Sequence, residues 1–105
     1  MFRKISLFLI ALSVLAVVSC SDFKKAQKST DIRLKYRIAE KYYKKGDYQR
    51  AVQLLDELLI YYRGSDTSEK INYNYAYCYF GMADYIQAGY YFLKFTTTFP
   101  TSRYA

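Results

Sequence analysis

The sequence predicts an all-α protein made of two helical-hairpin repeats behind an export signal. Three observations lead to this prediction. Apolar residues recur every three to four positions from residue 31 to residue 99, as on the buried face of amphipathic helices. Several residue identities repeat at one fixed spacing of 37 residues. One Pro and four Gly in 105 residues argue against collagen-like or low-complexity sequence and suit helices.

The N-terminus carries the pattern of an export signal. Arg3 and Lys4 precede an uncharged, mostly apolar stretch of fourteen residues, 5–18, which is the length of a signal-peptide core. A membrane-spanning helix needs roughly 20 apolar residues, and the charges that begin at Asp22 keep the stretch below that length. We therefore expect residues 1–19 to be a signal peptide.

The end of this signal resembles the lipobox of bacterial lipoproteins, because residues 17–20 read Val-Val-Ser-Cys. The resemblance implies that Cys20 is the lipidation site, where the thiol takes diacylglycerol and the amine freed by cleavage takes a third chain. Several acyl chains hold a protein to a bilayer firmly. Ser21 in place of an Asp implies delivery to the outer membrane. We expect residues 20–30 to be the lipidated cysteine and a polar, Lys-rich tether.

The composition limits the chemistry. The sequence has no His, which excludes Ser-His-Asp and Cys-His sites and His-containing metal sites. The four Gly are scattered, so no phosphate-binding loop is present. Without the signal peptide, 14 basic and 9 acidic residues give a net charge of +5, and outside the cytoplasm nucleic acid is not an expected partner. We expect no enzymatic activity, no cofactor and no metal, and we expect Cys78 to be buried.

Cap and breaker residues divide the rest of the chain into four helices. Thr30 and Asp31 are candidate N-caps of the first helix, and Asp47 and Asp84 at later turns are expected to be local caps. Arg63-Gly64-Ser65-Asp66 interrupts the apolar periodicity, and Pro100 ends it. The expected helices lie at 31–45, 48–62, 67–82 and 85–99.

The repeated identities resemble those of tetratricopeptide repeats. Small residues let the two helices of a unit approach closely, and the tyrosines that follow each turn are expected to fill the gap there. The resemblance implies repeat 1 over residues 31–66, repeat 2 over 67–102, and the start of a further helix at 103–105. Because such folds usually need about three units, we expect this chain to be the front of a longer one or to need a partner. The identical pairs are Ala39/Ala76, Tyr42/Tyr79, Asp47/Asp84, Tyr48/Tyr85 and Ala51/Ala88.

The first helix of each tetratricopeptide unit lines a concave groove. Aromatic and basic side chains together suit an extended peptide that ends in an aromatic residue with a free carboxylate. We expect half of the tyrosines on this face to pack between helices instead. The resemblance places these candidates in the groove: Arg33, Tyr36, Tyr43 and Lys44 in repeat 1, beside Glu40, and Lys70, Tyr73, Asn74, Tyr77 and Phe80 in repeat 2.

The lipobox, the Lys-rich segment, the unit at 42–51 and the Phe-Pro-Thr-Ser segment at 99–102 together resemble the N-terminal part of the BamD family of lipoproteins. The resemblance implies an adaptor, anchored by lipid in the outer membrane and facing the periplasm. It implies as partners BamA-type barrel assembly subunits, which dock on later repeats, and the C-terminal signal of unfolded outer-membrane proteins. Two alternatives remain open: a tetratricopeptide lipoprotein of the peptidoglycan or Tol system, and a surface lipoprotein whose tyrosines stack on glycans.

Overall fold

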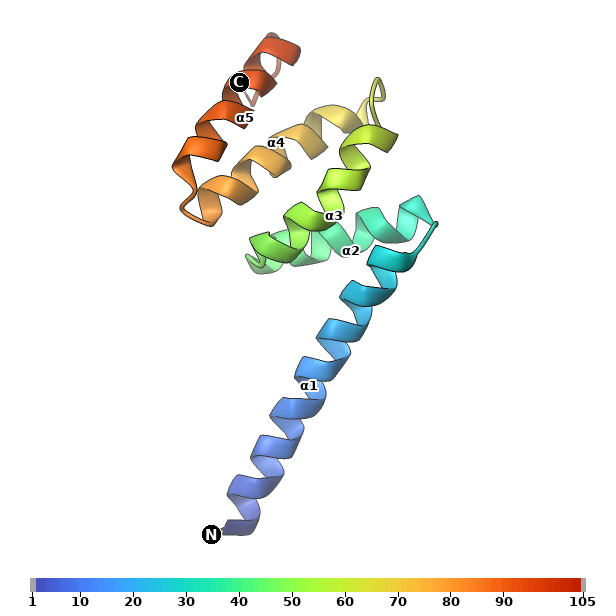
Figure 1. Cartoon of the computed structure of the whole chain (residues 1–105), viewed down its shortest axis with the longest axis vertical. Helices are drawn as coiled ribbons and strands as arrows, with labels where there is room; N and C mark the ends of the chain where they lie inside the picture. The colour runs from blue at the N-terminus through green and yellow to red at the C-terminus, as the bar shows by residue number, and fades with distance from the viewer. Residues whose placement is uncertain (1, 105) are drawn as a thin grey trace.

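The structure, a computed structural model, describes the backbone of residues 2–104 and the side chains of residues 3–10 and 22–104. No strand occurs among these residues, which confirms the all-α prediction. The helices are α1 (Phe2–Lys28), α2 (Ile32–Lys45), α3 (Tyr48–Tyr61), α4 (Thr67–Gly81) and α5 (Tyr85–Thr98) (Figure 1).

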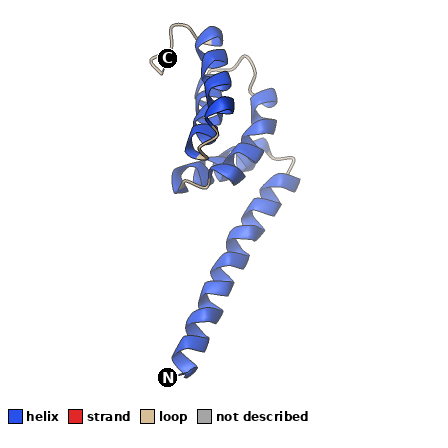
Figure 2. Ribbon diagram, turned by 60° about the vertical axis from the view of Figure 1, so that its left-hand side comes forward, coloured by secondary structure: helices blue, strands red, loops and turns tan. Residues whose placement is uncertain are grey.

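Consecutive helices pack as two hairpins. α2 packs against α3 and α4 against α5, and the hairpins meet where α3 packs against α4. Figure 2 shows these four helices gathered at one end of the molecule while α1 projects from them. The molecule is therefore elongated, 60 Å along its longest axis. The predicted pair of tetratricopeptide-like hairpins is confirmed.

Aspartates cap three of the helices, as the sequence predicted. Asp31, Asp47 and Asp84 each accept a hydrogen bond from backbone N–H groups of the first turn that follows, which satisfies donors that have no partner within the helix. The turns before Asp47 and Asp84 need a left-handed residue. Gly46 supplies it with φ 81°, and Ala83 supplies it in repeat 2 with φ 60°, a conformation that is unfavourable for a residue with a Cβ.

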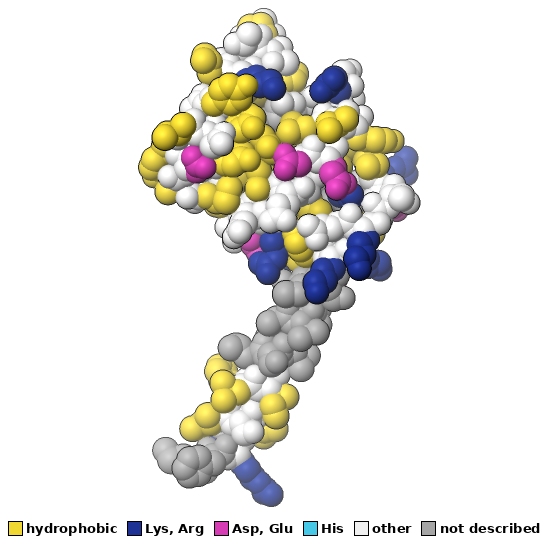
Figure 3. Space-filling view, viewed as in Figure 1, with side chains coloured by type: hydrophobic (Ala, Val, Ile, Leu, Met, Phe, Trp, Pro, Cys, Tyr) yellow, Lys and Arg dark blue, Asp and Glu magenta, His cyan; other side chains and the backbone are white. Residues whose placement is uncertain are grey.

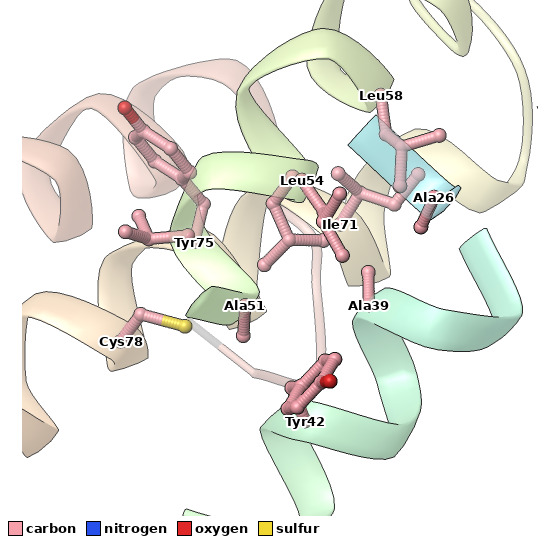
Figure 4. Close-up of a cluster of buried hydrophobic side chains, with 11 residues drawn as sticks. Ala26, Ala39, Tyr42, Ala51, Leu54, Leu58, Ile71, Tyr75 and Cys78 are labelled. Carbon is pink, nitrogen blue, oxygen red and sulfur yellow. The ribbon is translucent and has the colours of Figure 1, made fainter. Parts of the chain in front are cut away.

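The core lies where α2, α3 and α4 meet. The small Ala39 and Ala51 are fully buried there, so the two helices of repeat 1 approach closely, as predicted. Cys78 from α4 is buried in the same cluster, which confirms that prediction. Close packing of aliphatic side chains from three helices removes this apolar surface from water. Figure 4 shows the cluster, which includes Ala26, Tyr42, Leu54, Leu58, Ile71 and Tyr75.

The expected tether is corrected by the structure, because the chain stays helical to Lys28 and packs on repeat 1. Ala26 is fully buried, and the Phe23 ring lies edge-on to the Tyr42 ring with 5.9 Å between centroids. These two apolar residues are three positions apart and share one helix face, so a mostly polar segment still has a buried side. The side chain of Cys20 lies outside the described residues.

No helix among the described residues combines the length and the hydropathy that a membrane span requires.

The C-terminal residues also differ from expectation. Residues 103–104 form a turn instead of opening a helix, although the Ser102 hydroxyl accepts a hydrogen bond from the Tyr104 N–H at 3.1 Å. Ala105 lies outside the described residues. Tyr85, expected to fill the gap after its turn, contacts the Phe80 ring with 5.6 Å between centroids but stays 64% exposed.

Candidate functional site

Aromatic side chains of α2, α3 and α4 form a continuous band, which we define as Tyr43, Tyr48, Tyr73, Tyr77 and Phe80. Tyr43, Tyr48 and Tyr77 form a triangle with centroid distances of 5.8 to 5.9 Å. Tyr73 stacks on Tyr77 at 6.4 Å, and Phe80 lies 5.8 Å from Tyr77. Offset and edge-to-face contacts at these distances are favourable for aromatic rings, so each ring helps to hold its neighbour.

Helical spacing explains why α4 supplies most of the band. Tyr73, Tyr77 and Phe80 are three or four residues apart, so they lie on one side of the helix. Tyr75 and Tyr79 are offset by two positions and lie on the other side. Gly81 makes room for the band, because a Cβ there would lie 2.4 Å from the Tyr48 ring.

A small polar network borders the band. The Lys70 ammonium donates to Glu40 Oε1 at 2.8 Å, and the Tyr36 hydroxyl donates to the same oxygen at 3.0 Å. Partial burial alone would raise the pKa of the Glu40 carboxyl, but the hydrogen bonds from Lys70 and Tyr36 bring it below its usual value. The bond to Glu40 raises the pKa of Lys70. Lys70, predicted to face a peptide carboxylate, therefore already has a carboxylate partner.

The structure brings together some of the predicted residues and separates others. The band contains four of them: Tyr43, Tyr73, Tyr77 and Phe80. Two others, Tyr36 and Lys70, donate hydrogen bonds to Glu40. Lys44 is exposed and acts on the Glu40 carboxyl through its charge.

Arg33 and Asn74 are not among the residues of the band or of the network at Glu40. Arg33 lines a separate hollow of about 480 Å³ with residues that include Asp31 and Tyr62. Asn74 is only 8% exposed and is corrected to a buried position, because it follows Tyr73 on the helix and points between helices.

The tyrosines of the band are less exposed than a simple groove lining would be. All four of them are half-buried, so each one both packs and presents an edge to solvent: Tyr43, Tyr48, Tyr73 and Tyr77. Burial is the main reason that the pKa of Tyr43 is raised well above its usual value.

Three rings that the sequence did not assign to this face contact Tyr73. Tyr73 lies 5.9 Å from Phe92, 5.7 Å from Phe95 and 4.8 Å from Tyr104, on which it stacks. The helical spacing of Phe92 and Phe95 was a signal for a shared helix face. Nothing in the sequence places Tyr104 over Tyr73, because that contact depends on the turn after α5.

The opposite side of α4 uses its tyrosines differently. The Tyr75 hydroxyl donates to Asp56 Oδ1 at 2.6 Å, and its ring lies 4.8 Å from Tyr91. Burial and the bond to Asp56 raise the pKa of Tyr75 strongly. Tyr79 stacks on Tyr91 at 5.2 Å. A hollow of about 750 Å³ lies beside this cluster, lined by residues of α3, α4 and α5.

Within the described side chains, no group of three or more His, Cys, Asp or Glu is placed to hold a metal ion.

The family model of YfiO, described as an outer membrane lipoprotein, matches residues 27–105, which include both hairpins and the band. No curated protein and no solved structure matches the chain.

Proposed function

Because the chain belongs to the YfiO family of outer membrane lipoproteins, we propose that it is a non-catalytic adaptor of the β-barrel assembly machinery. The YfiO family is the BamD family, which supports a role in the assembly of outer-membrane proteins. In this proposal acyl chains on Cys20 hold the protein in the outer membrane with its hairpins in the periplasm. Its partners are BamA-type subunits and unfolded outer-membrane proteins.

The observation that carries the proposal is the aromatic band with a lysine at its border. Exposed edges of packed rings offer a preformed surface for the side chain of a terminal aromatic residue. Lys70 is half-exposed and lies beside Tyr36 and Glu40, so it can pair with the terminal carboxylate of the same peptide. An aromatic residue followed by a free carboxylate satisfies both features.

Binding would exchange one carboxylate partner of Lys70 for another. Glu40 keeps the hydroxyl of Tyr36 as a donor when Lys70 turns to the peptide, so the exchange leaves Glu40 with one of its two hydrogen bonds. A charge-assisted hydrogen bond contributes roughly 1.5–3 kcal/mol. The competition with Glu40 reduces the net gain and sets the affinity for the free carboxylate.

A peptide titration with three charge variants tests this site. The lipidated chain in nanodiscs is titrated with a decapeptide ending in Phe, as the free acid and as the amide. Lys70→Gln is expected to weaken binding of the free acid by roughly 10-fold or more, and Glu40→Gln is expected to strengthen it, because Lys70 loses its internal partner. Lys94→Gln, an exposed lysine on α5, serves as the matched control.

The amide form gives the second control. It lacks the terminal charge, so its affinity is expected to be low and equal for the wild type and all three variants. If Lys70→Gln and Glu40→Gln bind the free acid as the wild type does, Lys70 does not receive the carboxylate. Mass spectrometry of the membrane-extracted protein tests the anchor separately: the acylated mass is expected for the wild type and is lost in Cys20→Ser.

A further inference from the structure

Cations surround the point where α1 joins the hairpins. We define the basic collar as five side chains from three helices. Figure 3 shows Lys and Arg side chains gathered at the lower edge of the hairpins. The members of the collar are exposed or half-exposed: Lys24 and Lys25 on α1, Lys41 and Lys45 on α2, and Arg50 on α3.

Contacts to the start of the packed α1 segment hold the collar together. The Lys41 ammonium lies 2.9 Å from Asp22, and the Arg50 guanidinium lies 5.7 Å from the centre of the Phe23 ring. The hydrogen bond and charge of Lys41, with the more distant charges of Lys25 and Lys45, lower the pKa of the Asp22 carboxyl.

The collar carries excess positive charge. Its two acidic neighbours are Asp22 and Asp47, the latter 2.8 Å from Arg50. Five cations minus these two carboxylates leave a net charge of +3. Three like charges over so small an area create a potential that attracts anions.

The segment that leads to the anchor is fixed to the hairpins. The Lys35 side chain is 4% exposed, is paired with Glu57, and donates to the Gln27 carbonyl at 3.5 Å. Gln27 also contacts Gln53 of α3 at 3.4 Å, and Ala26 is fully buried. The last turns of α1 therefore move with the hairpins, so the orientation of the collar relative to Cys20 is set.

Helix geometry places the collar close to the acyl chains. Lys24 and Lys25 follow Cys20 by four and five residues, which at about 1.5 Å per residue is roughly 6 to 8 Å along the helix axis. Asp22 and Phe23, which contact Lys41 and Arg50, are nearer still. The Debye length at physiological salt is also about 8 Å, so headgroup charges at the anchored surface are only partly screened from the collar.

We propose that the basic collar docks on anionic phospholipid headgroups of the membrane in which the Cys20 acyl chains lie. The proposal rests on the lipid anchor of the proposed function and is independent of the peptide site. The anchor holds the hairpins close to the membrane, and the collar sets their orientation. The side of the hairpins that carries the collar therefore faces the membrane surface. Anionic lipid is the occupant because the anchor brings the collar to the bilayer whether or not another protein is bound.

A quenching experiment tests the orientation. Gln49 is exposed and lines a shallow hollow with Phe23, Lys24 and Arg50, so a fluorophore on Gln49→Cys reports on the collar. Acylated Cys20 and buried Cys78 leave the new thiol as the one that reacts. The lipidated protein is placed in vesicles of phosphatidylethanolamine alone, or with one quarter phosphatidylglycerol, each with a trace of headgroup-quencher lipid.

Docking predicts more quenching in the anionic vesicles, and a return to the value in neutral vesicles at high salt. The Lys24→Gln/Lys25→Gln/Lys45→Gln variant is expected to lose the difference between lipids, since each lysine near a surface contributes roughly fivefold to the docked population, or about 100-fold for three. A matched variant, Arg63→Gln/Lys94→Gln/Arg103→Gln, removes the same charge from exposed positions outside the collar and is expected to retain the difference.

Equal quenching in both lipids, or equal loss in both triple variants, would overturn the collar as a lipid-docking surface. Circular dichroism of each variant shows whether the helices are intact. Mass spectrometry of the same samples reads acylation of Cys20, so a missing anchor, which contradicts the proposed function, is distinguished from an anchored protein that does not dock.

Discussion

The two hairpins carry the same signature residues but bury them differently. Tyr42 is 1% exposed, because Phe23 of α1 covers it, whereas its counterpart Tyr79 is half-buried. Tyr48 packs against α4, whereas Tyr85 at the same place in repeat 2 is 64% exposed.

Neighbours on both sides account for this difference. Repeat 1 lies between the end of α1 and helix α4, so both of its sides are covered. Repeat 2 is covered on one side, and the outer face of α5 leaves Ile86 89% and Leu93 69% exposed. In repeat folds each unit is stabilised by its own packing and by its contacts to adjacent units, so equal sequence signatures give unequal stability.

The largest expected effect is on the thiol of Cys78, which belongs to repeat 2 in sequence but to the core shared with repeat 1. Burial raises its pKa from 9.0 to about 12, so at pH 8 the native thiolate fraction is about a thousandfold lower than in the unfolded chain. Native protein is expected to react with an aromatic disulfide reagent about a thousandfold more slowly than urea-unfolded protein.

The same pKa shift makes the free energy of unfolding depend on pH. The folded state favours the neutral thiol, so this stabilisation is complete below pH 9 and declines as the unfolded chain releases its proton between pH 9 and about 12. Urea midpoints measured across this range are expected to fall. Rapid modification of Cys78 in native buffer would contradict the shared core.

Two leucine truncations compare a covered helix with an uncovered one. Leu54 in α3 is 1% exposed and Leu93 in α5 is 69% exposed. Leu54→Ala is expected to lower the free energy of unfolding by about 2–5 kcal/mol because it leaves a cavity. Leu93→Ala is expected to change it by less than about 0.5 kcal/mol. Urea denaturation followed by circular dichroism measures both, and equal losses would contradict the difference between repeats.

Two glycine substitutions test the fit between the hairpins. Gly81→Ala places a Cβ 2.4 Å from the Tyr48 ring, and overpacking of this kind is expected to destabilise the fold by about 1–3 kcal/mol. Gly89→Ala meets no atom within 4 Å and is expected to stabilise α5 by about 0.5–1 kcal/mol, because Ala is the better helix former. Thermal unfolding of both variants shows whether each substitution raises or lowers the stability. A more stable Gly81→Ala variant would contradict the close approach of Gly81 to the Tyr48 ring.

Smaller effects than that of Leu54→Ala are expected at the left-handed turn position. Ala83 has φ 60°, whereas Gly46 at the same place in repeat 1 has φ 81°. Ala83→Gly is expected to stabilise the fold by about 1 kcal/mol, because glycine adopts this conformation without a Cβ clash, and Gly46→Ala is expected to destabilise it by a similar amount. Differential scanning calorimetry of the two variants checks the opposite signs, and shifts of the same sign would contradict the assignment.

Helix boundaries were predictable because caps and turn residues act locally. Asp31, Asp47 and Asp84 fix three helix starts through bonds to their own first turn, and the 37-residue repeat relates the hairpins. The packing of residues 22–28 was missed because a segment rich in lysine needs only Phe23 and Ala26 to bury one face.

The sequence predicted which residue types line the candidate face better than it predicted which residues they contact. Helical spacing places Tyr73 and Tyr77 on one side of α4, but a spacing does not show that Lys70 is paired with Glu40 across two helices. The contact of Tyr104 with Tyr73 depends on a turn outside the repeat. Such long-range pairs arise from the three-dimensional arrangement of elements and leave no local pattern.

Site-specific photo-crosslinking in living cells tests the central claim most directly. Benzoylphenylalanine replaces Phe80, which is 48% exposed at the edge of the band, or Tyr61, which is 63% exposed on α3 and outside it. Mass spectrometry then identifies the crosslinked peptides. The account predicts that position 80 captures C-terminal segments of outer-membrane proteins and that position 61 does not. Equal capture at both positions, or capture at position 80 of proteins other than outer-membrane proteins, would contradict it.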